Sequence, residues 1–158
     1  MNANYVFAFA VGIGIVAGLR AMTAPAAVTW AAYLGGLNLH GSPLAFMGSM
    51  VAVAIFTVGA IGEYIADKLP KTPSRTAPLG LIARIVTGGL SGACVCAAAG
   101  QSLLVGVVLG AIGAVIGAFG GYQVRTRLVR ALNVKDIFVA IPEDLVAIGA
   151  AYFFVSMR

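Results

Sequence analysis

Long apolar stretches, separated by short polar segments, dominate the pattern of this chain. No charged residue occurs in residues 44–62 or in residues 85–124. A helix that crosses a bilayer needs about 20 apolar residues, so residues 44–62 suit one crossing and residues 85–124 suit two. The pattern therefore predicts an all-α integral membrane protein, a compact bundle of five to six transmembrane segments in a single domain, residues 1–158.

The first apolar stretch, residues 3–39, contains one charged residue, Arg20. A single helix of that length would be about 55 Å long, well beyond a hydrocarbon core of about 30 Å, so the chain must turn or break. Pro25 has no amide proton to donate and Thr23 can cap a new helix, which favours a break between Arg20 and Pro25. A tilted hairpin, a re-entrant pair and one long kinked helix all fit this pattern.

Turn residues and prolines divide the rest of the chain. We expect a turn at residues 38–43, a proline-rich loop at residues 70–78, a polar break at residues 100–102, a basic loop from Arg125 to Asp136, and a last helix that begins near Pro142. Proline cannot continue a helix from the preceding turn, so it marks boundaries in such a pattern. The expected segments are about 3–20, 25–38, 44–69, 79–99, 102–124 and 138–157.

Composition and charge place the protein in a lipid bilayer. Hydrophobic residues make up 61% and charged residues 9% of the chain, whereas soluble domains are about 45–50% apolar and about 25% charged. The net charge of +5 is concentrated in the loops at residues 68–75 and 125–135, next to apolar segments. This is the positive-inside pattern, so we expect a multi-pass protein of the inner (plasma) membrane with these loops in the cytoplasm, and no nucleic-acid partner. Six segments put both termini outside, and five put the N-terminus inside.

No cofactor or metal site is apparent in the sequence. Cys94 and Cys96 lie two apart in an apolar segment, and residues two apart on a helix point to different sides. Zinc needs about four ligands, and the chain contains one His. We therefore expect the two cysteines to pack in the core.

Six charged residues are predicted to meet near the cytoplasmic side of the membrane. They are Arg20, Glu63, Asp67, Arg84, Glu143 and Asp144. Charges in or beside membrane segments are costly and usually face the bundle interior or water, so a cluster of both signs is a candidate site for a ligand or an ion. We expect Arg20 and Glu63 to pair.

Structural roles compete with this interpretation. Asp67 can pair with Lys71, Arg84 can extend its head to the membrane surface, and Glu143 with Asp144 can stabilise the first turn of a helix that starts at Pro142.

A stripe of glycines marks the segment at residues 102–124. The stripe consists of Gly106, Gly110, Gly113, Gly117 and Gly121. Steps of three and four residues place these positions on one helix face, where small residues let another helix approach closely. We expect this face to pack against a helix of the same chain, with a homo-oligomer as the alternative.

Several of these motifs, taken in order, resemble a known family. They are Gly18-Leu19-Arg20, Ser42-Pro43, Glu63 with Asp67-Lys68-Leu69-Pro70, Arg84, and Glu143-Asp144. Together they are similar to a family of small bacterial inner-membrane proteins catalogued as a domain of unknown function, over nearly the whole chain. The resemblance implies a polytopic bacterial membrane protein and supplies no reaction or ligand.

Three classes of function fit the sequence. A small transporter or channel-like protein fits the broken helices and the acidic groups, which can hold a small ion or solute. A membrane scaffold or assembly protein needs only the glycine faces. A membrane-embedded enzyme acting on lipid would need a nucleophile, a metal cluster or a phosphate-handling motif, and the sequence presents none of these. The sequence favours the transporter and leans away from an enzyme.

Overall fold

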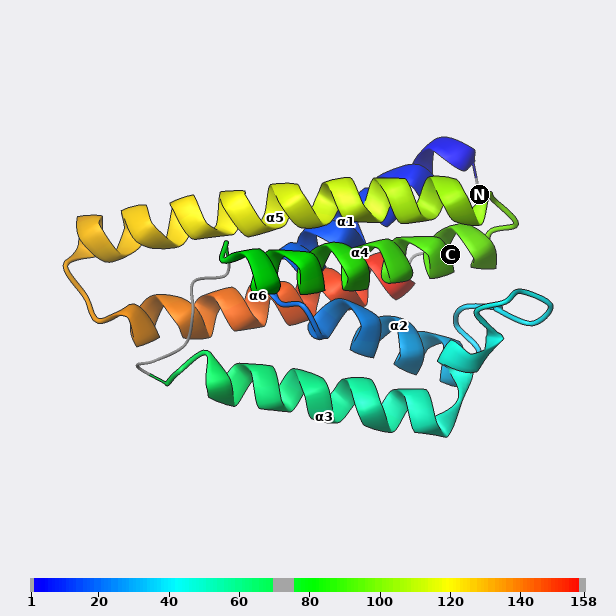
Figure 1. The fold of residues 1–158 in the computed structure, drawn as a ribbon, viewed down its shortest axis with the longest axis horizontal. Coiled ribbons are helices and arrows are strands. Elements are labelled where there is room, and N and C mark those ends of the chain that lie inside the picture. Colours follow the sequence, from blue (N-terminus) through cyan, green and yellow to red (C-terminus); the bar gives the residue numbers. More distant parts are fainter. Residues whose placement is uncertain (1, 70–75, 157–158) are drawn as a thin grey trace.

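A computed structural model describes residues 2–69 and 76–156, and in these residues the protein is a bundle of six α-helices without strands (Figure 1). The helices are α1 (Ala3–Leu19), α2 (Thr23–Tyr33), α3 (Met50–Ala66), α4 (Pro78–Ala98), α5 (Leu103–Leu132) and α6 (Asp136–Ser156), with a 3-10 turn at Ala45–Gly48 before α3. The predicted all-helical class is confirmed. The start of α1 and the end of α6 lie at the same end of the bundle (Figure 1).

Three of the helices, α4, α5 and α6, are long and apolar enough to cross a membrane. The apolar helices α1 and α3 have 17 residues each, about 25 Å at about 1.5 Å per residue. With 11 residues, α2 is shorter still. The protein therefore combines long helices with a set of shorter ones, as membrane proteins with broken helices do.

Helices α1 and α2 form a hairpin whose turn lies inside the bundle. The chain breaks at Arg20, which has an extended backbone conformation, and α2 then runs back toward the end where α1 began (Figure 1). A Cβ atom built on Gly18 would lie 2.7 Å from Cα of Gly117, near the middle of α5. Of the three arrangements that fit the sequence, the structure has two helices joined by an interior turn, and not one long kinked helix.

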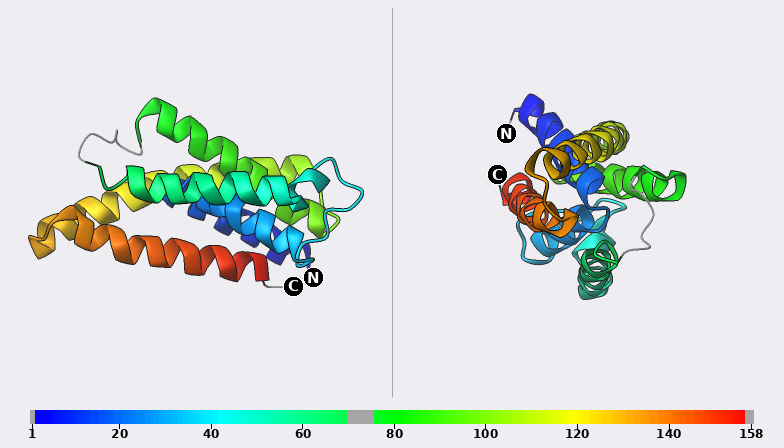
Figure 2. Two further views of the ribbon diagram at one scale, coloured as in Figure 1. Left: turned by 90° about the horizontal axis from the view of Figure 1, so that it is seen from below. Right: turned by 90° about the vertical axis from the view of Figure 1, so that its left-hand side faces the viewer.

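Glycines bring α1, α4 and α5 into close contact, and these three helices form the most tightly packed part of the bundle (Figure 2). Gly106 and Gly110 pack on the α4 backbone, where a Cβ on Gly106 would lie 2.7 Å from Cα of Ala93. Gly113 and Gly117 pack on α1, where a Cβ atom built on either glycine would lie 3.0 Å from a backbone atom of Ile15. The stripe is thus shared between two helices of the same chain.

The long helix α5 extends further than expected. It continues to Leu132, so the prediction of a loop from Arg125 to Asp136 is wrong for most of that range. Arg and Leu are good helix formers, and a basic residue in the last turn, Arg130, interacts favourably with the helix dipole. The helix ends at Asn133, whose positive φ of 50° is typical of a helix C-terminus.

The last helix begins earlier than Pro142. It starts at Asp136, whose carboxylate suits the positive end of the helix dipole, and Pro142 lies inside it. Membrane helices tolerate an internal proline when neighbouring groups satisfy the freed carbonyl. Glu143 and Asp144 therefore do not lie in the first turn, and the dipole explanation for them is wrong.

The second and third segments are shorter than predicted. The helix α2 ends at Tyr33, and Gly35 follows with a φ of 77°, a conformation that glycine adopts readily. The third segment opens with the 3-10 turn, and α3 proper starts after Ser49, whose side chain accepts a hydrogen bond from the amide of Ala52 at 3.1 Å.

Candidate functional site

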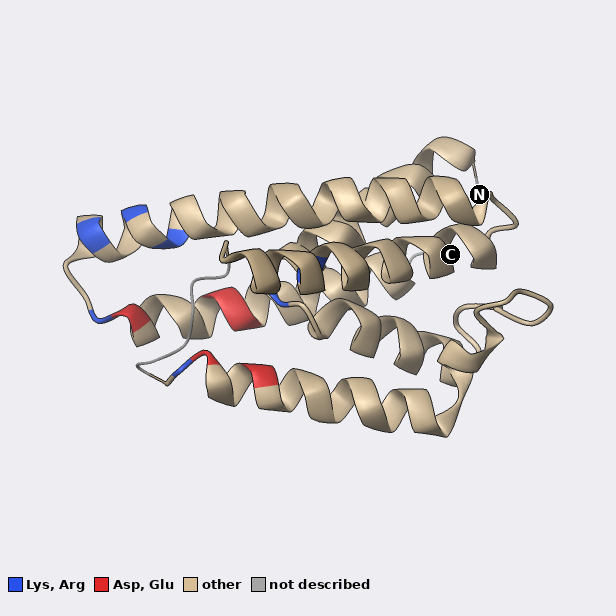
Figure 3. Ribbon diagram, viewed as in Figure 1, with Lys and Arg blue, Asp and Glu red and all other residues tan. Residues whose placement is uncertain are grey.

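The charged residues gather in one half of the bundle. Figure 3 shows them at the turn between α1 and α2, on α4, at the last turns of α3 and α5 and on the first half of α6, while the described residues of the opposite end of the bundle carry none. The site holds all five carboxylates of the sequence and three arginines. The central cluster comprises Arg20, Glu63, Asp67, Arg84 and Asp144, and the outer cluster comprises Arg125, Asp136 and Glu143.

Arg20 is the centre of this site, and its side chain is fully buried. It comes from the break between α1 and α2. Its Nη1 forms an ion pair with Asp67 at the end of α3, and its Nη2 forms one with Asp144 of α6. One guanidinium therefore joins α3 to α6. Burying an arginine in apolar surroundings is costly unless carboxylates compensate it, which both partners do.

Two further features of Arg20 distinguish it from a simple ion pair. Its guanidinium carbon lies 5.4 Å from the ring centre of Tyr64, within the range of a cation–π interaction. Its Nε is buried and has no hydrogen-bond partner within the described part of the chain. An unsatisfied buried donor is unusual, and a water molecule or a ligand commonly satisfies such a group.

Glu63 caps α2 from a different helix. Its two carboxylate oxygens accept hydrogen bonds from the backbone amides of Ala21 and Met22, each at 2.8 Å. The first amides of a helix lack partners and carry partial positive charge, so a carboxylate there is stabilising. Met22, the N-cap residue of α2, supplies no side-chain cap of its own. Glu63 thereby attaches α3 to the interior turn.

Arg84 holds the other side of the same turn. It is buried, its Nε donates to the carbonyl of Gly18 at 3.1 Å, and its Nη1 donates to the carbonyl of Gly80 at 3.0 Å. Its Nη2 lies 3.7 Å from a carboxylate oxygen of Glu63. The arginine thus neutralises the end of α1, where backbone carbonyls lack helical partners, and does not reach out to the membrane surface.

The outer cluster joins α5 to α6. Nε of Arg125 donates to Asp136 at 2.7 Å, and its Nη1 lies 3.4 Å from Glu143. Arg125 and Asp136 were not among the predicted site residues, because the sequence placed both in a loop. The ion pairs of Arg125 with Asp136 and Glu143 form because α5 continues past residue 124 and carries Arg125 alongside α6.

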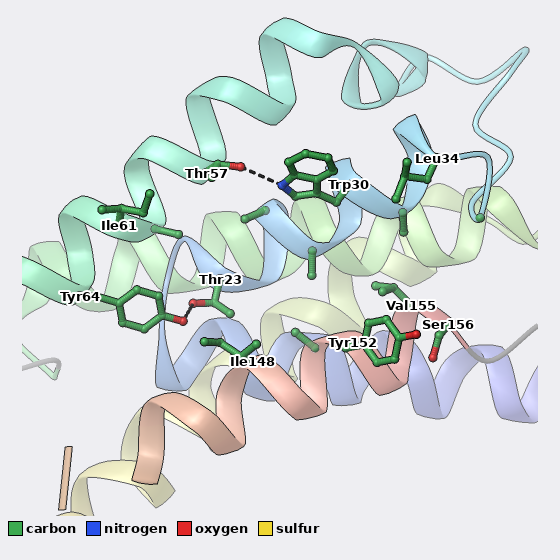
Figure 4. A pocket seen from close by; sticks show the side chains of 16 residues that line it. Thr23, Trp30, Leu34, Thr57, Ile61, Tyr64, Ile148, Tyr152, Val155 and Ser156 are labelled. Carbon is green, nitrogen blue, oxygen red and sulfur yellow. Dashed lines mark hydrogen bonds between the residues drawn. The ribbon is translucent and has the colours of Figure 1, made fainter. Parts of the chain in front are cut away.

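A groove lies between α2, α3 and α6 (Figure 4), and its lining includes Tyr64, whose ring lies against Arg20 of the central cluster. Its volume is about 640 Å³. We call it the α2–α3–α6 groove, and it is lined by Thr23, Ala26, Ala27, Trp30, Ala31, Leu34, Gly36, Thr57, Ala60, Ile61, Tyr64, Ile148, Ala151, Tyr152, Val155 and Ser156. Two hydrogen bonds tie α3 to α2 along it, one between the hydroxyls of Thr23 and Tyr64 at 2.7 Å and one from Trp30 Nε1 to Thr57 at 3.0 Å.

A second, smaller cavity of about 410 Å³ lies beside the outer cluster. It is lined by Leu19 of α1 and by residues of α5 and α6, including Arg125 and Glu143. Gly121, the last glycine of the predicted stripe, is half-buried and lines this cavity. Arg125 and Glu143 of the outer cluster therefore border a mainly apolar cavity.

The motifs of the sequence can now be compared with known proteins. A family model described as a domain of unknown function, DUF4126, matches residues 7–157. The chain belongs to the DUF4126 family. Comparison with curated proteins and with solved structures gives no match.

The family to which the sequence motifs pointed is confirmed, and its model covers every residue of the central and outer clusters. The family itself carries no assigned reaction, so the function has to be argued from the geometry of the site.

The structure of this DUF4126 protein gathers the six predicted charged residues but pairs them differently. Arg20 pairs with Asp67 and Asp144, and Glu63 pairs with Arg84 and the amides of the turn. The expected pairing of Arg20 with Glu63 is therefore wrong. Lys71, the alternative partner for Asp67, lies outside the described residues.

Glu143 and Asp144 separate into different clusters. They are adjacent in sequence, and consecutive residues of a helix point about 100° apart, so Asp144 turns to Arg20 and Glu143 turns to Arg125. The two cysteines are buried and free, and within residues 2–69 and 76–156 no group of His, Cys, Asp and Glu has metal-binding proximity.

Proposed function

We propose that this DUF4126 protein is a small transporter or channel-like protein of the inner membrane, multi-pass, that handles a small cation or a proton at Arg20, Asp67 and Asp144. The observation that carries the proposal is the buried Arg20, which lies at an interior helix break and joins α3 to α6 through two carboxylates.

Charge balance supports an ionic ligand. Two carboxylates, Asp67 and Asp144, share the one guanidinium of Arg20. Excess negative charge in apolar surroundings is costly, and a proton or a cation relieves it.

The interior turn supports the same proposal. Transporters built from broken helices place helix ends near the middle of the bilayer, where these ends contribute to an ion or substrate site. Here the end of α1 and the start of α2 meet at Arg20, and Arg84 and Glu63 satisfy the exposed backbone groups. Asp67 and Asp144, by contrast, form their ion pairs among the described residues with Arg20.

A mechanism follows from these contacts. A proton or a cation that binds Asp67 or Asp144 weakens the pair of that carboxylate with Arg20. The link between α3 and α6 then loosens, and the helices can separate around the site. Glu63 keeps α3 attached to the turn, so the movement is a hinge of α3 and not its release.

Ion flux in proteoliposomes tests the proposal. The purified protein is reconstituted with a dye inside that senses protons, Na⁺ or K⁺, and the gradient of the matching ion is imposed in turn. We expect one of these gradients to drive flux in the wild type and Asp144→Asn to abolish it. Lys135→Gln, which neutralises an exposed charge of the same end of the bundle, is the matched control and should transport normally. Wild-type vesicles that leak no more than empty vesicles for all three ions would contradict the proposal.

A scaffold or assembly protein is the second candidate. It is favoured by the pairing of every carboxylate in the site with an arginine or with backbone amides. The glycines from Gly106 to Gly117 contact α1 and α4 of the same chain, so a homo-oligomer would use other faces. Analytical ultracentrifugation in detergent, combined with a negative flux result, would support this candidate.

A further inference from the structure

We propose that the α2–α3–α6 groove binds an apolar organic cation, whose positive charge lies at the inner end of the groove, near Asp67 and Asp144. The inference rests on the proposed function, because it adds an organic cation to the small cation or proton that is handled at Arg20, Asp67 and Asp144. Its volume of about 640 Å³ lies within the range of about 300–1,000 Å³ that is usual for small-molecule sites.

The lining of the groove continues directly into the ion pairs of Arg20. On α3, Asp67 follows the lining residue Tyr64 by three positions, and on α6, Asp144 precedes the lining residue Ile148 by four. Residues three or four apart on a helix are neighbours on one face. Both carboxylates therefore lie about one helical turn beyond the inner end of the groove.

Charge decides between a cation, an anion and a neutral molecule. Two carboxylates share the single guanidinium of Arg20 at this end, which attracts a cation and repels an anion. A neutral apolar molecule would gain contacts with the walls but nothing from the excess charge. A buried cation also needs a compensating carboxylate, and Asp67 and Asp144 supply one about one helical turn beyond the lining.

Aromatic side chains in the groove suit a cation as well. Trp30, Tyr64 and Tyr152 come from three different helices and line the same space (Figure 4). The faces of Trp and Tyr rings attract cations, including quaternary ones that make no hydrogen bonds. Tyr64 already lies against a cation, the guanidinium of Arg20.

The groove is reached from the side of the bundle. Its walls α3 and α6 carry exposed apolar residues next to it, such as Ile61 and Leu145, and such surfaces face lipid in a membrane protein. An apolar cation concentrates in the bilayer and can enter between the two helices from there. The Thr23–Tyr64 hydrogen bond and the Arg20 ion pairs form the inner end against which it stops.

Trp30 provides a direct assay, because it is the single tryptophan of the chain and lines the groove. Full-length protein in detergent is titrated with tetraphenylphosphonium and, separately, with tetraphenylborate, which has the same shape and the opposite charge. We expect a saturable change in Trp30 fluorescence, with a Kd for tetraphenylphosphonium at least about tenfold lower than for tetraphenylborate.

Two variants locate the site. Asp144→Asn should raise the Kd for tetraphenylphosphonium about tenfold and leave the Kd for tetraphenylborate unchanged or lower. Because Asp144 also holds Arg20, a second variant is Tyr152→Ala, which truncates an exposed groove residue and should weaken tetraphenylphosphonium binding several-fold. Tyr122→Ala removes an exposed tyrosine of α5 outside the groove and is the matched control.

The outcomes separate this inference from the proposed function. Equal affinity for the two ions, or a groove occupied only by lipid with no saturable response, would overturn the cation site. Selective binding of tetraphenylphosphonium without ion flux in proteoliposomes would keep the site and remove transport. Flux that depends on Asp144 without tetraphenylphosphonium binding would keep transport and overturn the substrate class.

Discussion

The bundle holds its helices together in two different ways. Around α5, the glycines of α1, α4 and α5 let the backbones approach until no side chain separates them. Around α3, the contacts are polar: Trp30 with Thr57, Thr23 with Tyr64, Glu63 with the turn, and Asp67 with Arg20. Figure 2 shows α3 at the edge of the bundle, away from α5, and it packs mainly against α2.

This difference has consequences for movement. Close backbone packing has one arrangement and tolerates no insertion, so α1, α4 and α5 form a rigid frame. Hydrogen bonds and ion pairs can be broken one by one when a proton, a cation or a ligand competes for them. We therefore infer that the α3 side of the molecule moves and that the α5 side does not.

The largest effect is expected from filling the glycine contacts. A Cβ atom on Gly110 would lie 2.9 Å from the carbonyl carbon of Gly88 and 3.1 Å from Cα of Gly92. Overpacking by one methyl costs about 1–3 kcal/mol or more, so Gly110→Ala should lower the unfolding temperature markedly and Gly110→Leu should prevent folding. Gly120→Leu is the control, since nothing lies within 4 Å of a Cβ there. Size-exclusion chromatography and thermal unfolding in detergent measure both, and equal tolerance at the two positions would contradict the rigid frame.

A smaller but still large effect is expected at Arg20. Arg20→Met leaves Asp67 and Asp144 without their buried partner, which costs about 3–5 kcal/mol. Combining it with Asp144→Leu removes one of the two stranded charges and should recover much of that stability. Thermal unfolding of the single and double variants forms a double-mutant cycle, and purely additive losses would show that the two residues are not coupled.

The smallest effect is expected for the Thr23–Tyr64 hydrogen bond. Tyr64→Phe removes the hydroxyl and keeps the ring against Arg20, so it should cost about 1 kcal/mol. Its influence should be local, with faster hydrogen exchange in α3 and unchanged exchange in α5. Phe119→Tyr, on the exposed side of α5, adds a hydroxyl elsewhere and serves as a control. Faster exchange throughout the bundle would mean that α3 is not a separate mobile element.

Much of this fold was accessible from the sequence because apolar length and charge position are local properties. The charge-free stretches predicted membrane helices, and the single charge at Arg20 within a stretch too long for one helix predicted a break. The full extent of α5 was missed because its basic last turns resemble a loop when only hydropathy is considered. The ion pair of Arg125 with Asp136, which holds this part of α5 close to α6, is visible only in the structure.

The pairing in the site was harder to predict. The sequence indicates which charged residues lie at the same depth along the bundle. The partner of each charge depends on how each helix is rotated about its axis, and the spacing of residues within one helix does not determine that rotation. Glu63 illustrates the difficulty, since its main partners are the backbone amides of Ala21 and Met22 and not a side chain. The α2–α3–α6 groove was also missed, because it exists only through the relative placement of three helices.

The central claim is that Arg20 with its two carboxylates is an ion site and not only a structural bridge. Ion flux through the Arg20→Met, Asp144→Leu double variant in proteoliposomes tests this most directly. We predict a folded protein that regains much of the stability lost in Arg20→Met and whose flux equals that of empty vesicles. A double variant of that stability that transports at the wild-type rate would show that the cluster serves structure alone.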